Sequence, residues 1–152
     1  MMTPAGFDHG WIGQRLGTRL SVFVEGNRLG VVTGSDTGFV LARNPDTVRA
    51  PDVAFISRAR VPESPTPGFF EGPPDLAVEV ISPSDRASDL LAKVQEWLAW
   101  GCLAVWVADP QKKTVSVYQS RGAVTLLKPG DRLDGGDVLP GFSLAVDELF
   151  SR

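Results

Sequence analysis

Hydrophobic residues recur every three or four positions between residues 10 and 25, which predicts an amphipathic helix over this range. Arg15 and Arg19 occupy the polar side of the pattern. Gly26 and Asn27 suit a left-handed helix cap, so we expect the helix to end there. The apolar stripe consists of Trp11, Ile12, Leu16, Leu20 and Phe23 or Val24.

A second helix is predicted between residues 83 and 100. Ser82-Pro83-Ser84-Asp85 combines a capping serine, a proline at the first helical position and a nearby acid, which is a typical helix start. Gly101 is a typical stop. The residues that we expect to face the core are Leu90, Val94, Trp97 and Leu98.

The rest of the chain reads mainly as short strands. Residues 29–33 and 38–42 are strand candidates joined by a hairpin-like turn at 34–37. Residues 103–108 form a nearly continuous apolar run, typical of a central strand buried on both faces. Further elements are predicted at 52–57, 75–81, 114–118 and 124–127 (strands) and at 146–150 (a short helix). This order indicates an α/β or α+β fold with a mixed sheet.

A proline- and glycine-rich loop is expected over residues 61–74, too irregular for regular structure. Long loops of this kind are often lids or binding loops. Within it, Phe69 and Phe70 form an apolar pair that either docks on the body of the protein or contacts a partner.

The composition describes an ordinary soluble globule of 152 residues, with 43% hydrophobic and 22% charged residues. One domain over residues 1–152 is the economical interpretation. A single cysteine and a single histidine exclude disulfide frameworks, thiolate zinc clusters and multi-histidine metal sites. The sequence shows no membrane span or signal peptide, so we expect a cytoplasmic protein.

The net charge of −3 does not indicate nucleic-acid binding, but the charge is unevenly distributed along the chain. Residues 1–62 hold seven arginines and five acids, or +2, and the remainder sums to −5. Arginine favours bidentate contacts with phosphate. The excess is either a chance fluctuation, the more ordinary interpretation, or part of a basic face formed on folding.

Carboxylates within apolar strand sequence are costly unless a partner such as a metal ion compensates them. Glu79 lies at the centre of a strand, where glutamate is disfavoured. Asp75 is on the same face but about 13 Å away at roughly 3.3 Å per residue, too far to share one ion. Asp52, on another strand, is the better partner for Glu79, and two such carboxylates can hold Mg²⁺.

Ordinary roles are open for each of these residues. Asp52 and Asp75 each follow a proline and could simply accept backbone hydrogen bonds at a strand start. Lys93 lies four residues after Asp89, the spacing of a helix ion pair. His9 suits a surface or capping position. Packing roles are expected for Trp97, Trp100, Trp106 and Cys102.

Several segments together resemble the Uma-two family of putative restriction endonucleases, within the PD-(D/E)xK nuclease superfamily. The resemblance covers nearly the whole chain from His9 onward. It implies a restriction-endonuclease-like core and cleavage of DNA that depends on Mg²⁺ or Mn²⁺. The matching segments are Leu29-Gly30-Val31-Val32, residues 51–57, residues 74–85, Asp89, Lys93, residues 105–110, residues 130–133 and residues 139–142.

The resemblance implies that Asp52 and Glu79 are the metal ligands and catalytic acids. The superfamily lysine would follow the second acid by two residues, where this chain has Ile81, so Lys93 is the candidate for that role. Asp75, Asp89 and His9 would support the ligands without binding the ion. Family members usually begin with a further acidic segment, which this chain is expected to lack.

Two other functions are open at this point. The chain could be an inactive nuclease-fold module that binds DNA or protein, as Ile81 and the acidic net charge suggest. It could also be a sheet-based dimerisation domain in which Phe69 and Phe70 dock across subunits. DNA is the expected partner in the leading hypothesis, and a homodimer is the expected assembly.

Overall fold

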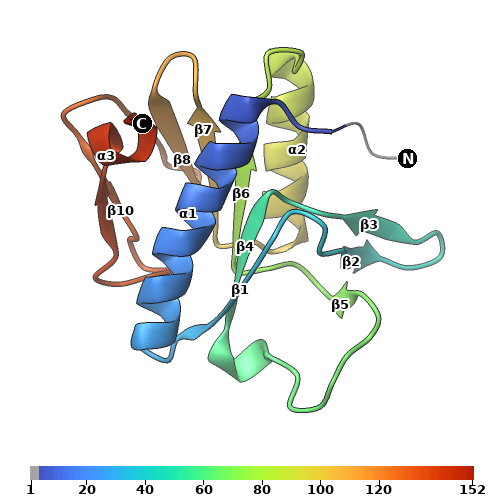
Figure 1. Cartoon of the computed structure of the whole chain (residues 1–152). Coiled ribbons are helices and arrows are strands. Elements are labelled where there is room, and N and C mark those ends of the chain that lie inside the picture. Colours follow the sequence, from blue (N-terminus) through green and yellow to red (C-terminus); the bar gives the residue numbers. More distant parts are fainter. Residues whose placement is uncertain (1–3) are drawn as a thin grey trace.

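The computed structural model describes residues 4–152, and its centre is a six-stranded mixed sheet (Figure 1). The strand order is β1-β4-β6-β7-β8-β9. β6 and β7 are parallel, and every other neighbouring pair is antiparallel. The strands are β1 (Gly30–Thr33), β4 (Val53–Ser57), β6 (Leu76–Val80), β7 (Ala104–Asp109), β8 (Thr114–Gln119) and β9 (Val124–Leu127).

Helix α1 (Phe7–Gly26) covers one face of this sheet (Figure 1). Its fully buried residues repeat every four positions, which aligns them along one side of the helix. They pack against strand side chains such as Val53, Leu76 and Val78. The buried stripe of the helix is Ile12, Leu16, Leu20 and Val24.

Helix α2 (Ala87–Trp100) lies on the opposite face, where Val94 and Trp97 are buried. It ends at Gly101, whose φ of 118° is in the left-handed region that favours glycine. The strand residues beneath it alternate with those beneath α1, as the pleat requires. They include Ala54, Ile56, Ala77, Val105 and Val107.

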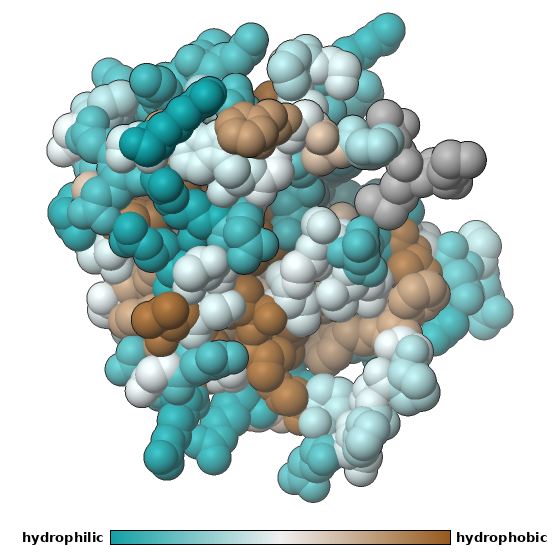
Figure 2. Space-filling model, viewed as in Figure 1, coloured by the Kyte–Doolittle hydropathy of each residue, from teal (hydrophilic) through white to brown (hydrophobic). Residues whose placement is uncertain are grey.

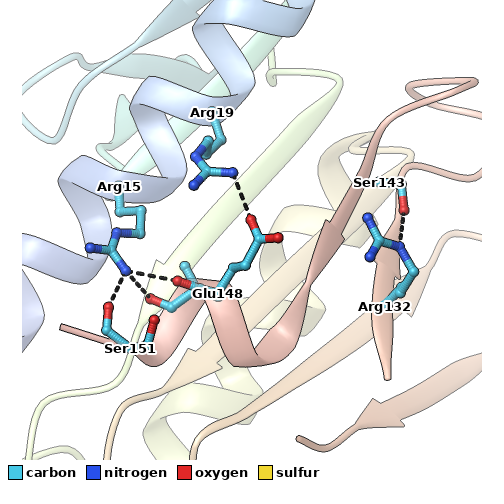
Figure 3. A network of polar contacts seen from close by, with 7 residues as sticks. Arg15, Arg19, Arg132, Ser143, Glu148 and Ser151 are labelled. Carbon is cyan, nitrogen blue, oxygen red and sulfur yellow. Dashed lines mark hydrogen bonds and ion pairs between the residues drawn. The ribbon is translucent and has the colours of Figure 1, made fainter. Parts of the chain in front are cut away.

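Two small sheets and a short helix complete the fold. One sheet has the order β3-β2-β5, formed by β3 (Thr47–Arg49), β2 (Phe39–Ala42) and β5 (Phe70–Glu71). The other pairs β10 (Arg132–Asp134) with β11 (Ser143–Ala145), and a contact from Arg132 to Ser143 spans the two strands (Figure 3). A 3-10 turn, η1 (Arg58–Arg60), follows β4, and the short helix α3 (Val146–Phe150) ends the fold.

Arg15 fastens α1 to α3, elements from opposite ends of the chain (Figure 3). Its Nη1 donates to the carbonyl oxygen of Glu148 at 2.7 Å and also reaches the carbonyl oxygens of Leu149 and Ser151. Such carbonyls have no partner within a helix end. One turn along α1, Arg19 pairs with the Glu148 carboxylate at 3.1 Å. The polar contacts with α3 therefore add to the packing that holds α1 on the sheet.

Most predicted elements are confirmed, including both long helices, the central strand at 103–108 and the short helix at 146–150. The fold class is confirmed as a mixed sheet flanked by helices. Cys102 is fully buried, as expected, and burial raises the pKa of its thiol to about 12. No helix within residues 4–152 has the length and apolar character needed to cross a membrane.

Three local predictions were wrong. β1 and β2 do not form a hairpin, because β1 pairs with β4 while β2 joins β3 and β5 in another sheet. The loop at 61–74 contains a strand at Phe70–Glu71. Residues 82–85 do not begin α2, because the Asp85 carboxylate accepts the Ser82 N–H and holds a separate turn.

The two residues of the apolar pair in that loop differ in exposure. The Phe70 ring packs edge-on against Phe39 of the same chain, with centroids 5.6 Å apart. Phe69 is 59% exposed. Docking on the body of the protein is therefore confirmed for Phe70.

Candidate functional site

The two carboxylates predicted to act together lie at one end of the sheet. β4 and β6 are antiparallel with Val53 opposite Val78, and this register brings Asp52, just before β4, to the level of Glu79. Both long helices begin at this same end (Figure 1). The N-termini of α1 and α2 add partial positive charge there.

Asp52 is held by a strand and by a helix. Its Oδ2 accepts the backbone N–H of Val80 at 2.7 Å and lies 3.2 Å from Nε2 of His9, near the start of α1. The side chains of His9 and Asp52 are 17% and 19% exposed, so their contact is largely sheltered from water. These contacts fix the Asp52 carboxylate at the edge of a solvent-accessible space.

Glu79 is more deeply placed, with only 6% of its surface exposed. Its side chain lies on the α2 face, where Oε2 accepts the indole N–H of Trp97 at 2.9 Å. Burial raises the pKa of Glu79 to about 7, because removal from water disfavours the charged form. The Trp97 hydrogen bond and the charge of Lys93 lower this pKa, while the charge of Asp52 raises it further.

Lys93 is exposed and one turn before Trp97 on α2, so it points toward the same end of the sheet. Its charge acts on Glu79, as the pKa of that carboxyl reflects. Asp89, also exposed, makes no ion pair with it among residues 4–152. The ordinary helix ion pair considered for Lys93 is therefore not formed.

Asp75 lies at the other end of β6 and has a different environment. Its carboxylate accepts the backbone N–H of Ser57 and pairs with Nη1 of Arg60 at 3.1 Å. These contacts account for its burial without a metal ion. The structure therefore brings together Asp52, Glu79, Lys93 and His9, while Asp75 stands apart and Asp89 lies exposed at the start of α2.

The site opens into two clefts that share His9. A groove of about 450 Å³ runs beside α1 and β1, and it is lined by Asp52, His9 and small residues such as Gly13 and Thr33. A smaller cleft of about 190 Å³ lies between the start of α1 and the turns after β6 and β7. Ile81 lines this second cleft and brings no cation to it.

The pair of carboxylates is compatible with Mg²⁺ or Mn²⁺. Within residues 4–152, no group of three or more histidine, cysteine, aspartate or glutamate side chains is arranged to hold a metal ion. Magnesium, however, is usually bound by one or two carboxylates together with waters and substrate phosphates. The hydrogen bonds engage Oδ2 of Asp52 and Oε2 of Glu79, which leaves Oδ1 and Oε1 for an ion.

Most arginines of residues 1–62 contact other groups of the same protein. Four of its seven arginines form ion pairs: Arg19 with Glu148, Arg43 with Asp46 and Glu71, Arg49 with Glu96, and Arg60 with Asp75. The excess of positive charge in the sequence therefore does not by itself produce a free basic face.

Two contributors to the site were not foreseen. Trp97 was expected only to pack, yet it also donates the hydrogen bond that holds Glu79. Its position four residues after Lys93, on the same side of the helix, was a usable signal. The N–H of Val80 could not be found from residue type, because every residue except proline carries this donor.

A family model and a solved structure are similar to this chain. The model of the Uma2 family, described as "Putative restriction endonuclease", matches residues 1–147. Among solved structures, the chain is similar to a putative nuclease belonging to DUF820 from Anabaena variabilis, with a TM-score of 0.85 and 20% identity. That similarity covers 98% of this chain and 83% of the other, and it shows the fold. A comparison with curated proteins found no match.

Proposed function

The chain belongs to the Uma2 family of putative restriction endonucleases, and on that premise we propose that it is a metal-dependent endonuclease that hydrolyses DNA phosphodiester bonds. The observation that carries this proposal is the meeting of Asp52 and Glu79 at one end of the sheet, within the field of Lys93. A buried acid with a raised pKa and a charged neighbour is a frequent property of active sites.

Asp52 and Glu79 are the residues that would hold the ion, through Oδ1 and Oε1. A divalent cation supplies charge stabilisation to the scissile phosphate and makes a coordinated water more acidic. Asp52 is already oriented by Val80 and His9, so little rearrangement is needed to present its carboxylate. Trp97 does the same for Glu79.

His9 and Lys93 act on the two sides of this pair. His9 donates to Asp52 when its Nε2 carries a proton, which keeps the aspartate in one rotamer, and such contacts tune ligands that bind metals. Lys93 supplies a positive charge next to Glu79 that favours the ionised carboxylate and stabilises the charge that develops on the phosphate. Lys93 fills the role of the superfamily lysine, whose usual position is occupied by Ile81 in this chain.

The direct experiment measures nicking of supercoiled plasmid DNA with Mg²⁺ or Mn²⁺. The wild-type protein is expected to cut, and the Asp52→Ala and Glu79→Ala variants are expected to lose activity at least a hundredfold. Glu63→Ala, which removes an exposed acid in the loop after η1, is the matched control and should cut normally. Equal nicking by all four proteins would assign the cutting to a contaminant and reject the proposal.

The second candidate is a nuclease-fold module that binds DNA or protein without cutting. The observation in its favour is the uncharged side chain of Ile81 at the position where the superfamily has its lysine. Calorimetric titration with Mn²⁺ separates the two, because a working site requires metal binding that disappears in Asp52→Ala. A homodimer and a cytoplasmic location remain predictions, and light scattering tests the first.

A further inference from the structure

The start of α1 carries an exposed aromatic side chain beside a cation. Phe7 is 75% exposed, and the guanidinium of Arg152 lies 5.6 Å from the centre of its ring. One turn along, the Trp11 ring lies 4.7 Å from the Arg15 guanidinium and 5.9 Å from that of Arg152. We call Phe7, Trp11, Arg15, Lys113 and Arg152 the aromatic–cation cluster.

The positive charge of this cluster is only partly neutralised. Arg15 donates to carbonyl oxygens, which carry no net charge. Lys113 makes no ion pair among residues 4–152. Asp8 is the acid in contact with the cluster and pairs with Arg152 at 2.7 Å. Arg15 and Lys113 therefore carry positive charges that no acid pairs with among the described residues, which favours an anionic ligand.

The cluster adjoins the candidate active site through clefts that share lining residues. The groove beside Asp52 and the smaller cleft share His9, and Phe7 lines that smaller cleft. A third cleft, of about 260 Å³, is lined by Trp11, Lys113 and Arg152 and shares Asp8 and Pro110 with the second. A ligand could therefore extend from Asp52, past His9 and Phe7, to Lys113 and Arg152.

Phe7 contributes little to the core, and its surroundings suggest a binding role. The buried stripe of α1 begins at Ile12, so Phe7 belongs to the part of the helix beyond the packed core. Figure 2 shows that hydrophobic and hydrophilic residues are interspersed on the face of the molecule that Figure 1 presents. A single exposed apolar residue needs no explanation, but aromatic rings interleaved with cations are typical of single-strand binding surfaces.

We infer that the aromatic–cation cluster binds a single-stranded stretch of the DNA substrate, with one unpaired base stacked on Phe7 and phosphates held by Lys113 and Arg152. A base within a duplex is already stacked on both faces, so it has no free face against which the Phe7 ring could stack. The cluster therefore favours DNA with an unpaired end, flap or gap beside the bond to be cut. This inference rests on the proposed function, because it assigns the substrate of the same site.

The test measures binding by fluorescence anisotropy, in EDTA so that no cutting occurs. The probe is a labelled oligothymidylate of about twelve nucleotides, within the range of known single-strand sites. Phe7→Ala should weaken binding about tenfold, and Phe7→Trp should restore it. Phe69→Ala removes another exposed aromatic, from the loop after η1, and is the matched control, which should bind as the wild type does.

A second probe separates stacking from charge. On an abasic oligonucleotide of the same length, Phe7→Ala should bind as the wild type does, while a Lys113→Ala/Arg152→Ala double variant should bind more weakly on both probes. Absence of oligothymidylate binding by the wild type would overturn the inference. So would an equal effect of Phe7→Ala and Phe69→Ala, or a preference for duplex DNA of the same length.

These outcomes are distinct from those that test catalysis. Binding in EDTA does not require Asp52, so Asp52→Ala should bind oligothymidylate normally while losing cleavage. If Phe7→Ala weakens oligothymidylate binding but no nicking occurs with Mg²⁺ or Mn²⁺, the binding role of the cluster is supported and the endonuclease proposal fails. Nicking that depends on Asp52 and Glu79, together with oligothymidylate binding that does not depend on Phe7, would support the endonuclease proposal and overturn the role of the cluster.

Discussion

The indole N–H of Trp97 donates to Oε2 of Glu79 at 2.9 Å, between a helix and the strand that it covers. This contact gives a buried carboxyl one fixed orientation. It does not fully offset the cost of burial, since the pKa of Glu79 is raised from 4.5 to about 7. The site therefore holds an acid that is partly protonated near neutral pH before any ion binds.

Glu79→Gln is expected to change how stability depends on pH. The folded protein keeps the Glu79 proton between pH 4.5 and about pH 7, where the unfolded chain loses it, so the wild type loses stability as pH rises through this window. Above pH 7 the loss is ~3 kcal/mol. Urea unfolding in metal-free buffer should show that the variant gains this amount relative to the wild type between pH 4.5 and 8. Parallel pH profiles would contradict the raised pKa.

His9→Ala should weaken Mn²⁺ binding about tenfold, because it removes the contact that orients the Asp52 carboxylate. Calorimetric titration measures the effect. Gln14→Ala, which alters the same groove without touching Asp52, should bind Mn²⁺ normally. Equal affinities for the wild type and His9→Ala would show that His9 does not position the ligand.

Lys93→Met should lower the rate of DNA cleavage about a hundredfold while changing Mn²⁺ affinity far less, because its charge acts mainly on the phosphate and is one of the smaller influences on the ionisation of Glu79. Lys128→Met, which changes an exposed lysine in the turn after β9, is the control for lost surface charge. A loss of metal binding equal to the loss of rate would assign Lys93 to the structure of the site instead.

Asp75→Asn should destabilise the protein by about 2 kcal/mol, because the ion pair with Arg60 is lost in a largely buried setting. Mn²⁺ affinity should not change, since Asp75 lies at the far end of β6. Chemical unfolding and calorimetry on the same variant provide both values. Weaker metal binding in this variant would restore Asp75 to the site.

Arg15→Met should cost about 2 kcal/mol of unfolding free energy, since it removes charged hydrogen bonds to carbonyl oxygens at the end of α3. Arg19→Met removes a more exposed ion pair one turn away and should cost less than about 1 kcal/mol. Similar losses for both variants would show that surface charge, and not the carbonyl contacts, stabilises this junction.

The parts of the fold that follow local rules could be predicted from the sequence. The four-residue repeat of α1, the glycine stop of α2 and the apolar run of β7 each depend on neighbours within a few positions. Strand partners do not. Residues 34–37 suit a tight turn. However, Phe39 and Leu41 of β2 are buried in one cluster with Ile56 of β4 and Trp97 of α2. This packing places β2 in a different sheet from β1.

The candidate site was partly predictable, because some of its features depend on residues close in sequence and others on distant parts of the chain. Asp52 and Glu79 stood out because acids in strands are costly, and the register of β4 and β6 brings them level. The contact of His9 with Asp52 depends on where α1 lies across the sheet, which no spacing within the helix reveals. That placement depends on the packing of the buried stripe against the sheet and on the contact of Arg15 with Glu148, 133 positions later in the chain.

The contact between Arg15 and α3 also bears on how the chain folds. Arg15 and Glu148 are 133 positions apart, so their contact closes a very long loop. Contacts of high sequence separation are costly to form early in folding. We therefore expect the junction of α1 and α3 to form late in refolding, after the contacts within each helix.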